Sequence, residues 1–140
     1  MGVSIDMTYD GDLLCTATHE PSGRTLVTDA PRDNGGMASS FSPTDLVAAA
    51  LGTCMLTIMG LVARQHGLDL RGARVRVIKE MAADPARRIG ALTVTVTMPP
   101  GLELGAKERT LLERGAQTCP VKHSLHPETK VDVVFEYPTG

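Results

Sequence analysis

The sequence of 140 residues contains few aromatic side chains, with two Phe, two Tyr and no Trp. The core must therefore be aliphatic, and the aromatic platforms on which proteins stack nucleic-acid bases are scarce. Charge is nearly balanced, with 14 Lys and Arg against 16 Asp and Glu, and no run of basic residues occurs. This composition argues against binding to nucleic acid or to an anionic membrane surface.

The first twelve residues, MGVSIDMTYDGD, lack the basic leader and the apolar core of a secretion signal. We therefore expect a cytoplasmic protein. The three cysteines, Cys15, Cys54 and Cys119, are an odd number, which does not fit the disulfide framework of a secreted module. A chain of this length is expected to form a single domain over residues 1–140, because one core suffices for roughly 100–200 residues.

Short alternating segments predict strands on both sides of a long helix. An Asp-Gly pair between the first two segments predicts a β-hairpin. The predicted strands are residues 3–11, 12–21, 23–31, 73–84, 89–100 and 131–138, and a second, amphipathic helix is predicted over residues 105–119. The order βββ–α–ββ–α–β has no regular βαβ alternation, which favours the α+β class.

The two middle strands alternate in a way that is typical of antiparallel strands with one solvated face. In the strand over 73–84, we expect Arg74, Arg76 and Lys79 to face outward. In the strand over 89–100, Leu, Val and Val alternate with threonines. The sequence therefore predicts an antiparallel pair with one face on the core.

The longest uncharged run extends over residues 46–63, which contain no Asp, Glu, Lys, Arg or His. Ser42 is suited to the N-cap of a helix, Pro43 to its first position and Asp45 to its electropositive first turn. The sequence therefore predicts a helix over residues 43–66.

This helix is apolar nearly all round, as in a buried central helix or a membrane span. Its uncharged run just reaches the length of a span. However, Ala, Thr, Gly and Cys dilute the run, and no basic flank precedes it. We therefore expect a buried helix and no membrane association.

Cys54 lies at the centre of this helix and Cys119 in a break after the second one. Cysteine is often a small buried hydrophobe, so packing alone explains an isolated thiol. A nearby Lys122, His123 or helix N-terminus would favour a reactive thiolate at Cys119. The spacing of Cys119, His123 and His126 also fits part of a metal site, but solvated histidines in a turn are the simpler interpretation.

The other polar candidates have ordinary structural interpretations. Cys15 lies in a predicted strand and is assigned to packing. Arg24 and Arg32 flank the third strand and its following loop, where solvated charge is the simpler interpretation and an anion or thiolate partner near Cys54 the functional alternative. Asp45 is assigned to the helix start rather than to acid catalysis.

Three segments together resemble the OsmC/Ohr family, that is, osmotically inducible protein C and the organic hydroperoxide resistance proteins. They are DAPRDNGG, SPTDLVAAALGTCMLTIMGLVARQHGLDL and RTLLERGAQTCPVKHSLHPETKVDV. The Ser-Pro-x-Asp-Leu and Ala-Leu-Gly-x-Cys elements, followed downstream by Cys-Pro-Val, are specific to it. With the strands between them, the resemblance covers nearly the whole chain.

The resemblance implies an α+β fold in which antiparallel sheets wrap around a long central helix of an intertwined homodimer. It implies thiol-dependent reduction of organic hydroperoxides in oxidative-stress defence, with Cys54 as the peroxidatic cysteine and Cys119 as the resolving one. It also implies an external dithiol reductant and no bound metal or flavin.

Two family features are replaced in this sequence. Thr44 occupies the position, ten residues before Cys54, where better-characterised members have a catalytic glutamate, and Asp45 follows it. The N-terminal hairpin, YDGDLLC, lacks the family's catalytic arginine, so Arg24 and Arg32 are the available substitutes. Two hypotheses follow: a two-cysteine peroxidase, or a non-catalytic dimer that senses redox state or binds a small apolar ligand.

Overall fold

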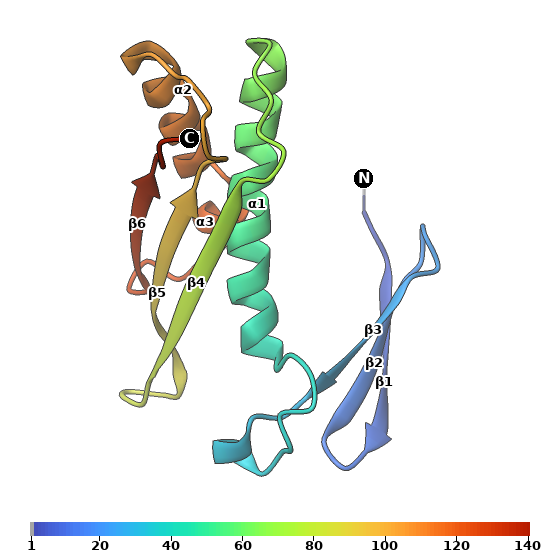
Figure 1. Cartoon of the computed structure of the whole chain (residues 1–140). Helices are drawn as coiled ribbons and strands as arrows, with labels where there is room; N and C mark the ends of the chain where they lie inside the picture. The colour runs from blue at the N-terminus through green and yellow to red at the C-terminus, as the bar shows by residue number, and fades with distance from the viewer. Residues whose placement is uncertain (1) are drawn as a thin grey trace. The chain divides into compact units, whose positions relative to one another are not determined.

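The computed structural model describes residues 2–140, and the chain divides into two compact units, Met1–Val47 and Ala48–Gly140 (Figure 1). The elements of the first unit are β1 (Ile5–Gly11), β2 (Leu14–His19), β3 (Thr25–Asp29) and the short 3-10 helix η1 (Arg32–Asn34). Helix α1 (Pro43–Gln65) begins in the first unit and continues in the second. The remaining elements are β4 (Arg74–Ala82), β5 (Arg88–Thr97), α2 (Ala106–Gln117), α3 (Pro120–Ser124) and β6 (Lys130–Glu136). The predicted α+β class is confirmed.

The first unit is an antiparallel sheet in the order β1-β2-β3. The β1–β2 hairpin turns at Asp12 and Leu13, whose φ angles are 53° and 65°. Two positive φ angles in a tight turn match the right-handed twist of the paired strands. The predicted hairpin is therefore confirmed, with its turn two residues beyond Asp10.

A buried carboxylate ties the end of β3 to the loop that leads into α1. Asp29 is 2% exposed, and its Oδ2 accepts hydrogen bonds from the Ser39 amide at 3.0 Å and the Ser39 hydroxyl at 2.6 Å. These bonds hold the pKa of Asp29 below its ordinary value. Within the same loop, a Cβ on Gly36 would lie 1.9 Å from the Ala30 carbonyl oxygen, so only glycine fits there.

Helix α1 begins with a reciprocal capping box. The Asp45 amide donates to the Ser42 hydroxyl at 3.1 Å, and the Ser42 amide donates to the Asp45 carboxylate at 2.8 Å. Two backbone donors that the helix cannot pair are thereby satisfied. The predicted start at Ser42-Pro43 is confirmed, and the helix ends at Gln65, one residue before the predicted end.

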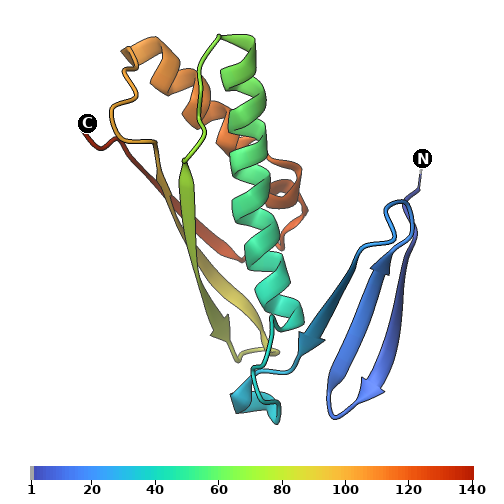
Figure 2. The same ribbon diagram turned by 45° about the vertical axis from the view of Figure 1, so that its right-hand side comes forward.

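The second unit packs α1 and α2 against one face of the sheet β4-β5-β6 (Figures 1 and 2). The fully buried side chains come from both helices and from the inner face of β5. They include Leu51, Met55, Met59, Leu92, Val94, Val96 and Leu112, each 0% exposed. The core is aliphatic, as the scarcity of aromatic residues requires.

One strand pair departs from the antiparallel expectation. Strands β4 and β5 are antiparallel, but β6 runs parallel to β5, with Val94 opposite Val133. The connection from β5 to β6 contains α2 and α3, and such a helical crossover is what joins neighbouring parallel strands.

The outward face of β4 also differs from the prediction. Arg74 and Arg76 are exposed as expected, but Ile78 is 48% exposed and Lys79 lies half-buried on the opposite face. Strict alternation along the strand places residues 74, 76 and 78 together, so the prediction for Lys79 was wrong.

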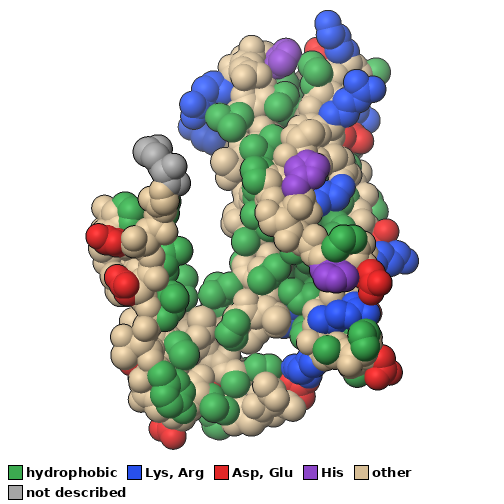
Figure 3. Space-filling view, turned by 180° about the vertical axis from the view of Figure 1, so that it is seen from behind, with side chains coloured by type: hydrophobic (Ala, Val, Ile, Leu, Met, Phe, Trp, Pro, Cys, Tyr) green, Lys and Arg blue, Asp and Glu red, His purple; other side chains and the backbone are tan. Residues whose placement is uncertain are grey.

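Helix α1 is the one helix among residues 2–140 that is long and apolar enough to cross a membrane by length and composition. This is weak evidence, because the core helix of a soluble protein passes the same test. Within the chain, α1 buries one face and leaves Thr53, Thr57 and Leu61 exposed. Hydrophobic side chains reach the surface of both units in the space-filling view (Figure 3).

Candidate functional site

Cys54 lies on α1, half-buried against the core of the second unit. Ile58 and Val62 follow at intervals of four residues on the same side of the helix. Val62 lies close to Gly115 of α2: a Cβ built on Gly115 would be 2.9 Å from Val62 Cγ2. The side of α1 that carries Cys54 therefore packs against α2, the helix that leads to Cys119.

Cys119 joins α2 to α3 and is 0% exposed. Its backbone is extended, with φ −64° and ψ 136°, as expected for a residue before Pro120. Its sulfur acts as the N-cap of α3 and accepts a hydrogen bond from the Lys122 amide at 3.2 Å. The short helix therefore presents a backbone donor to this thiol.

The structure brings the thiols of Cys54 and Cys119 together, and both are free. Burial is the main reason that the pKa of Cys119 is raised. The Lys122 amide opposes this shift, while the hydrogen bond and the charge of the neighbouring Cys54 add to it. The raised pKa of Cys119 favours its protonated thiol form, in contrast to the thiolate that the sequence suggested at this position.

The cation near Cys119 does not act as the sequence suggested. The Lys122 ammonium donates to the side-chain oxygen of Gln117 at the end of α2. His123 is exposed. The contact between Lys122 and the thiol is thus made by the backbone amide at the N-terminus of α3, the alternative to the two cations that the sequence offered. The signal was present in the order Cys-Pro, because Pro favours the first helical position and places Cys119 at the N-cap.

The polar candidates before Cys54 take part in the start of α1. The Asp45 carboxylate accepts the Ser42 amide, and the Thr44 hydroxyl lies 3.3 Å from the Ser42 hydroxyl. Arg24 and Arg32 are exposed residues of the first unit, at the turn before β3 and in η1. Cys15 lies half-buried on β2, opposite Tyr9 and Thr28.

No group of three or more His, Cys, Asp or Glu side chains within residues 2–140 could hold a metal ion. The Nδ1 atom of His126 accepts the Glu128 amide at 3.0 Å, which stabilises the turn before β6. The spacing of Cys119, His123 and His126 is therefore not realised as a metal site in this part of the chain.

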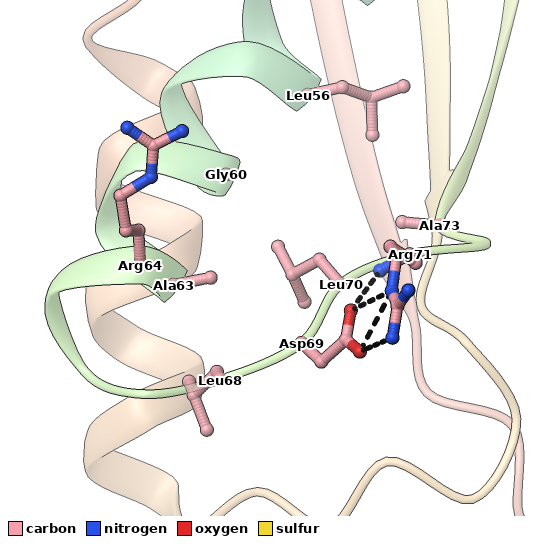
Figure 4. A pocket seen from close by; sticks show the side chains of 9 residues that line it. All are labelled: Leu56, Gly60, Ala63, Arg64, Leu68, Asp69, Leu70, Arg71 and Ala73. Atoms are coloured by element: carbon pink, nitrogen blue, oxygen red, sulfur yellow. Dashed lines mark hydrogen bonds and ion pairs between the residues drawn. The ribbon is translucent and has the colours of Figure 1, made fainter.

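A separate cavity of about 450 Å³ lies between the end of α1 and the segment before β4 (Figure 4). Leu56, Gly60 and Arg64 line it from the helix, and neither Cys54 nor Cys119 does. On the other side, an exposed ion pair joins Asp69 to Arg71 at 2.7 Å (Figure 4). Exposed pairs of this kind contribute little to stability.

The fold and the paired thiols define the class: an α+β protein with a two-cysteine site between helices. The family model for OsmC-like protein matches residues 35–134, and the chain belongs to this family. No curated protein sequence shows a significant match.

Solved structures of other family members are similar over nearly their full lengths. A protein from Psychrobacter arcticus, described as an osmotic stress induced and detoxification response protein, is 41% identical, with 96% of this chain and 97% of that chain covered and a TM-score of 0.89. An OsmC like protein from Mycoplasma pneumoniae is 15% identical, with coverage of 99% and 98% and a TM-score of 0.80. An organic hydroperoxide resistance protein OsmC from Legionella pneumophila is also 15% identical, with 97% of each chain covered and a TM-score of 0.76. The latter two support the fold alone.

Proposed function

We propose that this protein is a thiol-dependent peroxidase that reduces organic hydroperoxides through Cys54 and Cys119. The observation that carries the proposal is the meeting of two free thiols, one half-buried on α1 and one fully buried at the start of α3. Membership of a family that includes organic hydroperoxide resistance proteins supports a peroxide-related redox role.

The reaction begins at Cys54. Its thiolate attacks the outer oxygen of the hydroperoxide, the O–O bond breaks, and an alcohol leaves after taking a proton. Cys54 becomes a sulfenic acid. The sulfur of Cys119 then bonds to the sulfur of Cys54. The thiol proton of Cys119 and the hydroxyl of the sulfenic acid leave together as water. An external dithiol reduces the disulfide and is itself oxidised to a disulfide, so no resident cofactor is needed.

We propose that the protein works as a homodimer. On β1, Ile5, Met7 and Tyr9 alternate along one face and are 52%, 66% and 64% exposed. Exposed apolar surface of this kind is typical of an interface. A second copy would also cover the exposed side of α1, where Leu61 is 45% exposed.

OsmC-like proteins are generally soluble, which supports our proposal of a cytoplasmic location. We also retain the prediction that residues 1–140 act as one domain. The proposed partners are a small organic peroxide and a dithiol, with neither nucleic acid nor membrane.

The test follows consumption of cumene hydroperoxide in the presence of a dithiol. Wild type should consume peroxide catalytically, and Cys54→Ser should fall to the rate of the dithiol alone. With peroxide and no dithiol, Cys119→Ser should consume one equivalent and accumulate the Cys54 sulfenic acid. Cys15→Ser is the control for the loss of a thiol as such, since Cys15 is paired with Tyr9 and Thr28 within the sheet β1-β2-β3, and it should keep its activity. A wild type no faster than Cys54→Ser would exclude the peroxidase.

A specific observation favours the alternative, a non-catalytic dimer that senses redox state or binds a small apolar ligand. Thr44 stands in place of the family's glutamate, and the carboxylate of Asp45 accepts the Ser42 amide in the helix cap. The alternative predicts that the disulfide forms slowly with peroxide and without turnover, which the same assay measures.

A further inference from the structure

We infer that the external reductant attacks the sulfur of Cys54 in the Cys54–Cys119 disulfide, and that Cys119 is always the leaving thiol. This inference rests on the proposed function, because it concerns the return half of the same cycle. The intermediate is a mixed disulfide between Cys54 and the reductant. As the sulfur of Cys119 leaves, the Lys122 amide donates a hydrogen bond to it.

Access distinguishes the two sulfurs. Cys119 is 0% exposed and belongs to the packed core, whereas Cys54 is only half-buried at its edge. Thiol–disulfide exchange requires the attacking thiolate to reach one sulfur directly, so accessibility decides which is attacked. A second copy of the chain can only add burial, so dimer formation cannot open a route to Cys119.

Stabilisation of the leaving group points in the same direction. As the sulfur–sulfur bond breaks, negative charge develops on the sulfur that leaves, and a hydrogen bond to it speeds departure. The Lys122 amide already lies 3.2 Å from the sulfur of Cys119, with the geometry of a helix cap. The threonines beside Cys54 offer nothing comparable, because the hydroxyls of Thr53 and Thr57 donate to carbonyl oxygens of α1.

Burial opposes this departure, since it raises the pKa of the Cys119 thiol. However, the further upward influence of Cys54 comes from its charge and its hydrogen bond. Both are absent once Cys54 is bonded to the reductant. The Lys122 amide then acts against burial alone, and the thiolate takes its proton from solvent or from the second thiol of the reductant.

The complete return step is balanced. One reductant thiolate bonds to the sulfur of Cys54 and displaces Cys119 as a thiolate, which is then protonated. The second thiol of the reductant attacks its own sulfur in the mixed disulfide, releases Cys54 as a thiolate and leaves the reductant as a disulfide.

The test traps the mixed disulfide with glutathione, a monothiol that cannot complete the second step. Full-length protein is oxidised with diamide, which joins the cysteines without peroxide and so keeps this test independent of peroxidase activity. After brief exposure to glutathione, the sample is quenched in acid, alkylated, digested with trypsin and analysed by mass spectrometry. Trypsin separates the cysteines, with Cys15 on residues 1–24, Cys54 on residues 33–64 and Cys119 on residues 115–122.

We expect glutathione on the 33–64 peptide, which contains Cys54, and the alkyl group on the 115–122 peptide, which contains Cys119. Extrapolated to zero time, this product should be roughly tenfold more abundant than the product with the two labels exchanged. Glutathione mainly on the 115–122 peptide, or comparable amounts on both, would overturn the inference. So would failure of diamide to join the two cysteines. If the mapping succeeds but cumene hydroperoxide is not consumed, the peroxidase proposal fails while this directionality stands.

A pair of variants tests the amide separately. Lys122→Ala keeps the backbone donor and loses the ammonium, so it is the reference against which loss of the donor is measured. Lys122→Pro removes the donor and should slow reduction roughly tenfold, the usual effect of losing one hydrogen bond to a developing charge. In a Cys54→Ser background, Lys122→Pro should also raise the pKa of Cys119, measured by thiolate absorbance. Equal rates of disulfide reduction in the two variants would show that the Lys122 amide does not assist the departure of Cys119. The peptide mapping uses the wild-type protein and does not depend on these variants.

Discussion

Replacement of Gly115 by alanine would test whether the contact between α1 and α2 positions the two thiols. A Cβ at this position would lie 2.9 Å from Val62 Cγ2 and 3.6 Å from Ile58 Cγ2. The first distance is well inside the optimal separation of about 3.5–4.0 Å between carbon atoms. Val62 is β-branched and has little rotational freedom in a helix. The two helices must therefore move apart.

The expected magnitude follows from two opposing effects. Alanine in place of glycine stabilises a helix interior by about 1 kcal/mol. Overpacking costs about 1–3 kcal/mol. We therefore expect Gly115→Ala to lower the free energy of unfolding by about 0–2 kcal/mol. Val62→Ala should lower it by about 1 kcal/mol, because the valine side chain is only half-buried.

The double variant separates strain from other causes. With Val62 truncated, the new methyl group at position 115 has room, and the helix-propensity gain offsets the lost apolar contact. The double variant should thus unfold near the wild-type free energy, which corresponds to a coupling energy of about 1–3 kcal/mol. Gly60→Ala is the matched control, since a Cβ there meets nothing within 4 Å and should only stabilise α1.

Urea unfolding of the reduced proteins measures the free energies, and the rate of Cys54–Cys119 disulfide formation with diamide measures the functional effect. Gly115→Ala should slow disulfide formation because α2 leads directly to Cys119, and Val62→Ala should restore the rate in the double variant. Additive free energies within about 0.5 kcal/mol, or an unchanged disulfide rate in Gly115→Ala, would refute this reasoning.

Ser42→Ala should lower the free energy of unfolding in urea by about 0.5–2 kcal/mol, since it removes the N-cap of α1, and an unchanged value would contradict that assignment. Burial and the hydrogen bond to Glu113 raise the pKa of Tyr137, so the stability that this phenol contributes is complete below about pH 10 and declines at higher pH. Tyr137→Phe should therefore show a shallower loss of unfolding free energy above pH 10 than wild type. The lowered pKa of Asp29 gives the opposite pH dependence. The stability that this carboxylate contributes is present above about pH 4 and is lost as the pH falls below that value. Ser39→Ala should reduce this loss, and parallel unfolding curves for the two proteins between pH 6 and pH 3 would argue against it.

Residues close together in the sequence determined most helices and strands and the position of Cys54 on a long helix. Ser42 and Asp45 are three residues apart, so the cap of α1 was readable without any distant contact. Alternation gave the inner face of β5, where Leu92 and Val94 are buried. The run around Cys54 predicted a long helix, and the resemblance of the cysteine motifs to the OsmC/Ohr family was confirmed by the family match.

Tertiary structure decided the features that depend on distant partners. The parallel pairing of β6 with β5 follows from the crossover through α2 and α3, and Ile78 is exposed because pairing sets which face of β4 points inward. Cys54 and Cys119 are 65 residues apart in the sequence, and they meet because small residues such as Gly115 let α2 approach α1. The sequence by itself therefore determined which thiols are present and which helix carries the first. Packing between the helices decided that the two thiols meet, and that a backbone amide rather than the Lys122 ammonium contacts Cys119, because such contacts depend on side chains brought together only by the folded chain.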